Sequence, residues 1–223
     1  MNRFDLGILI SSFFELAKAL PLTLSVGILA MLIGLILGTS ISVYRYLYNG
    51  PLNKMLAGYI SFFRGTPLMI QLFLFFFGLP QIMPLFGRMN AFQASVLIMG
   101  INASAYVAES IRAALSSIDS LQHDAGLSIG LNRYQSMWYI LLPQAMRVAL
   151  PTLGNTFIGV IQGTSLTFML GLNDLMGLAK MRAASNYRFF EVYLAVGLMY
   201  WLITILLSKL NDRMAQKLKG EAN

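Results

Sequence analysis

Polar side chains recur at helical spacing inside two long apolar stretches of the chain. Asn102, Tyr106 and Glu109 stand at positions i, i+4 and i+7, which places them on one face of a helix. Asn155 and Gln162 repeat the outer spacing of that stripe farther along, with Gly159 between them. A polar group in an apolar environment is costly, so such residues tend to face a protein interior, a partner or a water-filled path.

Stripes of this kind have two interpretations. Polar residues often make ordinary hydrogen bonds between packed helices, and small residues such as Gly154 and Gly159 allow the close approach that these bonds need. Two stripes on neighbouring helices favour a shared path for a polar solute more than either stripe does alone. We therefore predict a path lined by Gln71, Asn102, Tyr106, Asn155, Gln162, Thr164 and Ser165.

The residue types present give little support to catalysis. His123 is the only histidine, there is no cysteine, and no serine is placed for a catalytic triad. No glycine-rich phosphate loop with a lysine occurs, so the chain is not expected to bind ATP in the usual way. We expect no enzymatic activity, no metal site, no cofactor of its own and no nucleic-acid partner.

The helices that carry these residues are expected to cross a membrane. The 223 residues are 57% hydrophobic and only 11% charged, and five uncharged runs are 17 to 26 residues long. About 20 apolar residues are needed to cross the hydrocarbon core. The sequence therefore predicts an all-α membrane protein, a single domain over 1–223 with five transmembrane helices. We expect the spans near 20–44, 68–79, 91–114, 148–171 and 190–207, after an interfacial helix within 1–19.

The basic residues predict the orientation of these helices. Ten lysines and arginines fall in the loop after the first span, the 110–147 region and the C-terminal tail, against six elsewhere. Cytoplasmic loops carry an excess of Lys and Arg, so the side with ten is expected to be cytoplasmic. The N-terminus would then lie outside, and the 118–145 segment and the C-terminus would lie in the cytoplasm.

A short motif between the first two spans interrupts a helical pattern. Arg64, Gly65 and Thr66 precede Pro67, which lacks a backbone N–H and disfavours helix at the residue before it. The simpler interpretation is a kink in a long membrane helix. The alternative is a break at the cytoplasmic edge that positions the next helix. In the third span, Arg112 is placed to pair with Glu109, three residues before it.

The segment from Asp124 to Pro143 is a polar insert between two apolar runs. It resembles the EAA signature of permease subunits of ABC importers, which has a glycine four residues after the triplet and ends in Ile-x-Leu-Pro. Asp in place of Glu and Gly in place of the second Ala are departures from that signature. The matching positions are Asp124, Ala125, Gly126, Gly130, Ile140, Leu142 and Pro143.

The resemblance covers the whole membrane part of the chain, about residues 20–210. The stretches R-G-T-P-L-M-I-Q-L-F at 64–73, A-Y-V-A-E-S-I-R-A-A at 105–114 and L-P-Q-A-M-R-V-A-L-P-T-L-G-N at 142–155 are similar to the polar amino acid permeases, as is T-S-L at 164–166. The family often has Lys-Asp before T-S-L, whereas this chain has Gln162 and Gly163 there.

The resemblance implies a MetI-like permease with five helices in a bacterial cytoplasmic membrane. The implied partners are a second permease subunit, identical or not, a solute-binding protein outside the membrane, and two cytoplasmic ATPase subunits that hold the Mg-ATP. The 118–145 segment would form a coupling helix that docks on the ATPase. Asp124 would lie near the start of that helix, where its charge is favoured, and Gly130 would permit a sharp exit.

The implied function is import of a polar L-amino acid by alternating access. Within the family, R-A-A-L-S-S-I-D at 112–119 is most similar to cystine-type permeases, so cystine or a related sulfur amino acid is one candidate substrate. One alternative is a self-sufficient secondary transporter or channel, although Glu109 is the only acidic residue within a predicted span apart from Glu191 at the start of the fifth. A membrane scaffold without transport is the other alternative, and it leaves the polar stripes unexplained.

Overall fold

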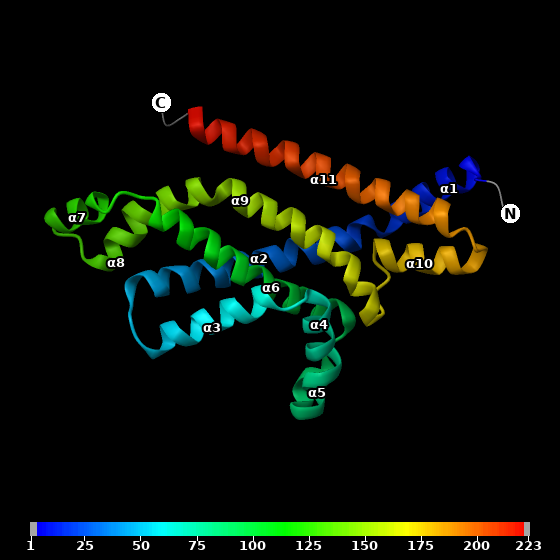
Figure 1. The fold of residues 1–223 in the computed structure, drawn as a ribbon, viewed down its shortest axis with the longest axis horizontal. Helices are drawn as coiled ribbons and strands as arrows, with labels where there is room; N and C mark the ends of the chain where they lie inside the picture. The colour runs from blue at the N-terminus through cyan, green and yellow to red at the C-terminus, as the bar shows by residue number, and fades with distance from the viewer. Residues whose placement is uncertain (1–3, 221–223) are drawn as a thin grey trace.

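The chain folds into long helices joined by short turns (Figure 1). The computed structural model describes residues 4–220, and within that range no strand occurs. In the first half of the chain the helices are α1 (Leu6–Leu16), α2 (Leu20–Leu47), α3 (Pro51–Gly65), α4 (Leu68–Phe73), α5 (Leu79–Ile82) and α6 (Ala91–Ser116). Those in the second half are α7 (Leu121–Ser128), α8 (Arg133–Ser136), α9 (Leu142–Gly163), α10 (Leu175–Asn186) and α11 (Phe189–Gly220).

Several of these helices continue into one another through tighter or wider turns. A 3₁₀ turn at Ala17–Ala19 joins α1 to α2, and another at Thr164–Leu170 follows α9. π-helical turns at Leu74–Gly78 and Met137–Leu141 join α4 to α5 and α8 to α9. The insert that the sequence places at 124–143 is therefore mostly helical, and its last part leads directly into α9.

The most extensive helix–helix contact joins α2 to α6. Glycines make this close approach possible, because a Cβ on Gly34 would lie 2.8 Å from Ala103 and one on Gly38 would lie 2.7 Å from Val107. From the α6 side, a Cβ on Gly100 would lie 2.8 Å from Ile33. Small residues at such contacts let two backbones pack tightly inside a membrane, where hydrophobic burial drives association little.

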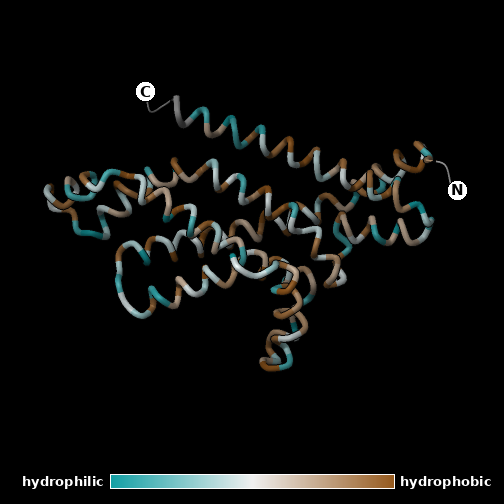
Figure 2. Tube along the Cα trace, viewed as in Figure 1, coloured by the Kyte–Doolittle hydropathy of each residue, from teal (hydrophilic) through white to brown (hydrophobic). Residues whose placement is uncertain are grey.

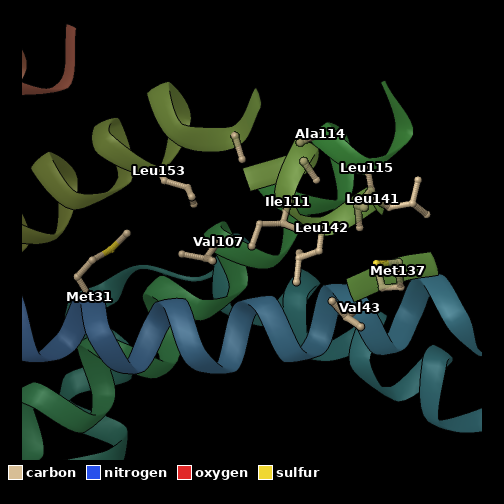
Figure 3. Close-up of a cluster of buried hydrophobic side chains, with 12 residues drawn as sticks. Met31, Val43, Val107, Ile111, Ala114, Leu115, Met137, Leu141, Leu142 and Leu153 are labelled. Carbon is tan, nitrogen blue, oxygen red and sulfur yellow. The ribbon is translucent and has the colours of Figure 1, made fainter. Parts of the chain in front are cut away.

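A buried apolar cluster anchors the α7–α8 end of the molecule to this helix pair (Figure 3). Met31 and Val43 of α2 and Ile111 of α6 belong to it, and Met137 and Leu141 join them from the turn before α9. Ile111 and Met137 have no exposed surface. The segment between α7 and α9 is therefore packed against the membrane helices.

The N-terminal helix predicted within residues 1–19 is α1, and residues 1–3 of that prediction lie outside the described residues. The side chain of Asp5 accepts hydrogen bonds from the N–H groups of Gly7 and Ile8 and so caps α1. Arg182 of α10 forms an ion pair with Glu15 and donates to Ser12 Oγ at 2.8 Å. These contacts bind α1 to α10, and Ser12 and Arg182 are 170 residues apart in the chain.

Three helical stretches are long and apolar enough to cross a membrane: Leu6–Leu47, Ala91–Ser116 and Phe189–Lys217. The pair Pro51–Gly65 and Leu68–Ile82 would count as a fourth if its two bent arms form one span. Figure 2 shows hydrophilic residues at the α7–α8 end and along the last turns of α11. The count of five spans and the orientation of the termini stay predictions.

The helix ends differ from the expected spans in an informative way. The fourth span was expected at 148–171, whereas α9 begins at Leu142 and ends at Gly163. Pro143 is the second residue of α9, which follows the π-helical turn Met137–Leu141 directly. The fifth was expected to end near 207, whereas α11 continues to Gly220.

Candidate functional site

A cavity of about 450 Å³ lies between α6 and α9, with Leu68 of α4 at its edge. Asn102 and Tyr106 face it from α6, and Asn155 faces it from α9. These three were predicted from the two polar stripes, and the structure brings them to one space. The remaining lining residues are mostly apolar or small: Met99, Ala103, Thr152, Thr156, Gly159 and Val160.

The Asn102 amide is held by the backbone where α3 ends. Its Nδ2 donates to the Phe63 carbonyl at 3.0 Å and to Gln71 Oε1 at 2.9 Å. Phe63 is four residues before Pro67, so its carbonyl is the one that the missing proline N–H leaves without a helical partner. Gln71 Nε2 also donates to this carbonyl, at 3.0 Å, and to the Thr66 carbonyl at 3.1 Å. The two amides thus replace the hydrogen bond that the proline removes from the Phe63 carbonyl.

The chain turns by 110° between α3 and α4 at this point. That angle is far larger than a kink in a continuous helix, so the simpler interpretation of this motif is wrong. Pro67 and Thr66 of the motif both take part in this turn. Thr66 Oγ1 donates to the Phe62 carbonyl at 2.8 Å and accepts from Gln71 at 2.9 Å. Gln71 is fully buried in this network, and it does not line the cavity.

A charged cluster lies one turn of α6 beyond Tyr106, on the side toward α7. Arg112 donates to both oxygens of Glu109, at 3.0 Å from Nε and 2.5 Å from Nη2, which confirms the predicted pair. Arg64 reaches the same carboxylate only at 3.9 Å, and its guanidinium lies 5.7 Å from the centre of the Tyr106 ring. All three charged groups are partly exposed, so the ion pairs themselves add little stability.

The other residues predicted for the path lie outside this cavity. Gln162 is exposed and donates to Thr204 Oγ1 of α11 at 3.3 Å. Thr164 is fully buried, donates to the Ile161 carbonyl at 2.7 Å and lies 3.3 Å from the Tyr200 hydroxyl. Ser165 is half-buried in the 3₁₀ turn after α9. Their role in a path stays a prediction.

Two polar lining residues, Thr152 and Thr156, were not among the predicted residues. Their spacing could have predicted them, since they stand three residues before and one residue after Asn155 on the same side of α9. Thr156 Oγ1 donates to the Thr152 carbonyl at 3.0 Å, so its hydroxyl is already bonded within its own helix. Threonine does this readily in apolar helices, and for that reason it is a weak marker of a site.

The segment expected to form a coupling helix contains α7 and α8. Gly130 ends α7 with a φ of 90°, a left-handed conformation that glycine adopts without strain. The Leu131 N–H bonds the Gly126 carbonyl at 3.1 Å and the Gly130 N–H bonds the Leu127 carbonyl at 3.0 Å, which is the Schellman pattern. The predicted sharp exit at Gly130 is therefore present.

Small size matters at Gly126 as well. It is buried, and a Cβ there would lie 2.9 Å from both Ser136 Oγ and the end of the Ile140 side chain. Ser136 Oγ is also 3.0 Å from His123 Nδ1. Gly126 thus lets α7 fold back on the start of the α8–α9 segment, and Ile140 is half-buried at that contact.

Asp124 and Ala125 lie on the exposed side of α7. Asp124 is in the first turn of the helix, but the N–H of Leu121 is bound by Asp119 Oδ1 at 2.9 Å. Asp119, and not Asp124, therefore provides the side-chain hydrogen bond at the start of α7. Large apolar side chains are exposed on the same end of the molecule, among them Ile129 at 77% and Tyr139 at 74%.

The arrangement defines a multi-pass helical membrane protein with a solute-sized cavity and a packed helical segment at one end. A family model described as "Binding-protein-dependent transport system inner membrane component" matches residues 30–220. The probable amino-acid permease protein YxeN of Bacillus subtilis is 43% identical over 95% of each chain. The L-cystine transport system permease protein TcyL of the same organism is 38% identical over 92% of this chain and 87% of that one.

A solved structure, described as an amino acid ABC transporter with histidines, is also similar. It covers 97% of this chain and 100% of its own, with a TM-score of 0.86 and 33% identity. The chain therefore belongs to the family of binding-protein-dependent transport system inner membrane components. The resemblance to amino acid ABC permeases expected from the sequence is confirmed.

Proposed function

We propose that the chain is the permease subunit of an ATP-driven importer that moves a polar L-amino acid inward by alternating access. The cavity between α6 and α9 supports this proposal most directly, because its amides and hydroxyls are set in an otherwise apolar lining. A volume of about 450 Å³ is within the usual range for small-molecule sites. The substrate would pass between these two helices as their surroundings rearrange.

The energy source is proposed to be a pair of ABC ATPase subunits that hold the Mg-ATP. The exposed face of α7 supports this, since Asp124 and Ala125 are accessible while Gly126 packs inward against Ser136 and Ile140. Exposed apolar groups such as Ile129 and Tyr139 offer contact area for a protein partner. Through Pro143 and the core around Met137, movement of this segment would be passed to α9 and α6.

The proposed assembly has a second permease subunit and a solute-binding protein. The membrane would be the bacterial cytoplasmic membrane, crossed five times, with α7, α8 and the C-terminus in the cytoplasm and the N-terminus outside. Ten of the sixteen basic residues on the proposed cytoplasmic side support this orientation. Fusion of a periplasm-active or a cytoplasm-active reporter at either end checks the orientation directly.

Single replacement of Asp124 or Gly130 tests the coupling. We expect each variant to lose substrate-stimulated ATP hydrolysis and uptake while the ATPase still co-purifies with the permease. If both activities survive in both variants, α7 is not the coupling element. Uptake into vesicles by the purified chain without any ATPase would instead indicate a self-sufficient transporter. Glu109 does not support that alternative, since Arg112 occupies both of its carboxylate oxygens.

For the substrate, cystine or a related sulfur amino acid is one proposal, and the similarity to the cystine permease TcyL supports it. The test is uptake of radiolabelled cystine by the reconstituted transporter, in competition with unlabelled glutamine, histidine and arginine. Cystine should compete best if the proposal holds. Stronger competition by another amino acid would replace cystine as the assigned substrate.

A further inference from the structure

We infer that the cavity takes an amino acid without net charge and holds its ammonium group on Asn102 Oδ1. The inference rests on the proposed transport function and adds a substrate class and a residue that orients the substrate. Two observations carry it: the direction in which the Asn102 amide is fixed, and the charge of the cavity lining.

The direction of the Asn102 amide follows from its partners. The Phe63 carbonyl can only accept a hydrogen bond, so the atom 3.0 Å from it must be Nδ2. The second N–H of that nitrogen donates to Gln71 Oε1, whose own direction is set because Nε2 faces the carbonyls of Phe63 and Thr66. Both donors of the Asn102 amide are therefore used outside the cavity.

What remains of that amide is an acceptor. No donor within residues 4–217 reaches Asn102 Oδ1, although Asn102 lines the cavity. A carbonyl oxygen that is held in place and left without a donor binds N–H or O–H groups and repels anions. The substrate group that meets it must be a donor, and the group common to all α-amino acids that fits is the ammonium.

The opposite wall can receive the carboxylate. Asn155 makes no hydrogen bond with the described residues, so its amide can turn its N–H groups toward a carboxylate. The hydroxyl of Thr152, also on α9, is a further donor at the lining. The cavity thus has a hydrogen-bond acceptor on α6 and hydrogen-bond donors on α9. These match the ammonium and the carboxylate of a zwitterion.

The lining has no counter-ion for a charged side chain. Among the described residues that line the cavity none is charged, and the lining is mostly apolar. The nearest cluster is Arg64, Glu109 and Arg112, where Arg112 satisfies Glu109 and leaves a net positive charge. An additional unpaired charge inside such a cavity is costly. Arginine and lysine should therefore be disfavoured, because the lining offers no counter-ion and the nearby cluster repels a positive charge. Glutamate should be disfavoured because the lining offers no counter-ion.

Equilibrium binding to the permease–ATPase complex tests this without the solute-binding protein, whose own selectivity would otherwise dominate. The complex is reconstituted in lipid nanodiscs and probed with radiolabelled glutamine and cystine. N-acetylglutamine lacks the ammonium and therefore carries a net negative charge, so it fails both requirements of the inference. It should compete at least about tenfold more weakly than glutamine. Arginine and glutamate should also compete about tenfold or more weakly. Equal competition by N-acetylglutamine, or by either charged amino acid, overturns the inference.

Gln71 provides the sharper variant, because it is fully buried and does not line the cavity. In Gln71→Leu, the Asn102 amide keeps the Phe63 carbonyl but loses Gln71 Oε1, one of the two partners that hold its direction. The preference for glutamine over N-acetylglutamine should therefore fall. Ser110→Ala is the matched control: Ser110 is a polar residue of α6 outside the lining, whose Oγ donates to the Tyr106 carbonyl at 2.9 Å. It should keep the wild-type preference. An unchanged preference in Gln71→Leu contradicts the role given to Asn102.

The wild-type panel decides the inference even if Gln71→Leu fails to fold. ATP-driven uptake by the complete transporter distinguishes a failure of this inference from a failure of the proposed transport function. Uptake of an amino acid together with no detectable or no selective binding to the cavity removes the inference alone. Absence of uptake for every amino acid removes the proposed function as well.

Discussion

The carboxylate of Asp174 lies fully buried at the start of α10. Its Oδ1 accepts a hydrogen bond from the Gly177 N–H at 2.9 Å, whereas Oδ2 has no hydrogen-bond partner among the described residues. Burial raises the pKa of Asp174 to about 6, compared with about 3.9 for an aspartate in an unfolded chain. The folded protein therefore binds this proton more tightly than the unfolded chain does.

The sign of the resulting pH dependence follows from linkage. A raised pKa contributes stability that is fully present below about pH 4 and is lost as the pH rises through about 6, roughly 3 kcal/mol in all. Asp174→Asn keeps the acceptor that caps α10 and removes the titration. We expect the melting temperature of the wild type in detergent to fall from about pH 4 to about pH 7 relative to that of the Asn variant.

Asp174→Ala separates the charge from the cap. It removes both, so it should be about 1 kcal/mol less stable than Asp174→Asn at every pH, with the same flat profile. Thermal unfolding of the three proteins at a series of pH values measures both effects. Parallel curves for the wild type and the Asn variant would show that burial of Asp174 does not govern this pH range.

At the scale of elements, the exit from α7 depends on one backbone conformation. Any residue other than glycine at position 130 must adopt a φ of 90°, which costs about 1–2 kcal/mol. Gly130→Ala should therefore lower stability by about that amount and loosen the contact between α7 and α8. Thermal unfolding measures the loss of stability.

Gly58 offers a matched control. It lies exposed within α3, and a Cβ there would meet nothing within 4 Å. Gly58→Ala should raise stability by up to about 1 kcal/mol, because alanine is the better helix former. The two substitutions thus make the same chemical change with opposite expected signs. A stabilising effect of Gly130→Ala would contradict the conformation assigned to the end of α7.

At the scale of the whole molecule, the last part of α11 is held against α9 by a polar contact. Asn211 Nδ2 donates to the Pro151 carbonyl at 3.1 Å, and its side chain lies over Gly154. Around it is an apolar cavity of about 380 Å³, lined from α2, α9 and α11 by residues such as Met31, Phe157 and Leu210. This contact joins helices that are 60 residues apart in the chain.

A double-mutant cycle tests that contact. A Cβ on Gly154 would collide with the Asn211 side chain, so Gly154→Ala should force Asn211 to move and lose its hydrogen bond. The expected cost is about 1 kcal/mol, similar to the cost of Asn211→Ala. The double variant should be no less stable than either single variant, since the same bond is lost in each. Additive losses in thermal unfolding would show that the two residues act independently.

Much of the candidate site could be read from helical spacing alone. Asn102 and Tyr106, one turn apart, reach the same cavity, and Arg112 pairs with Glu109 three residues before it. Gly130 has the left-handed conformation expected of a glycine at the sharp exit from α7. Side chains that share a face can be predicted in this way because a helix converts sequence distance into a known direction. That this face lines a substrate path stays a prediction. The family assignment, which rested on motifs along the chain, was confirmed by the comparisons.

The surroundings of a polar side chain depend on tertiary contacts that helical spacing does not give. Gln71 was expected to line the path, whereas it is buried at the α3–α4 break. Gln162 was expected there too, and it faces Thr204 of α11. Spacing within one helix shows which residues share a face, but not which neighbour that face meets.

The sequence by itself determined a helical membrane protein of an importer family, the faces of α6 and α9 that carry polar groups, and the turn at Gly130. Uncharged runs, helical periodicity and glycine conformation are local properties, so the sequence is enough for them. Only the tertiary structure decided that Pro67 turns the chain by 110° and that Gln71 and Asn102 bond the carbonyl it leaves free. Asn102 comes 39 residues after Phe63, and no local rule links two groups whose contact depends on how α3, α4 and α6 pack together.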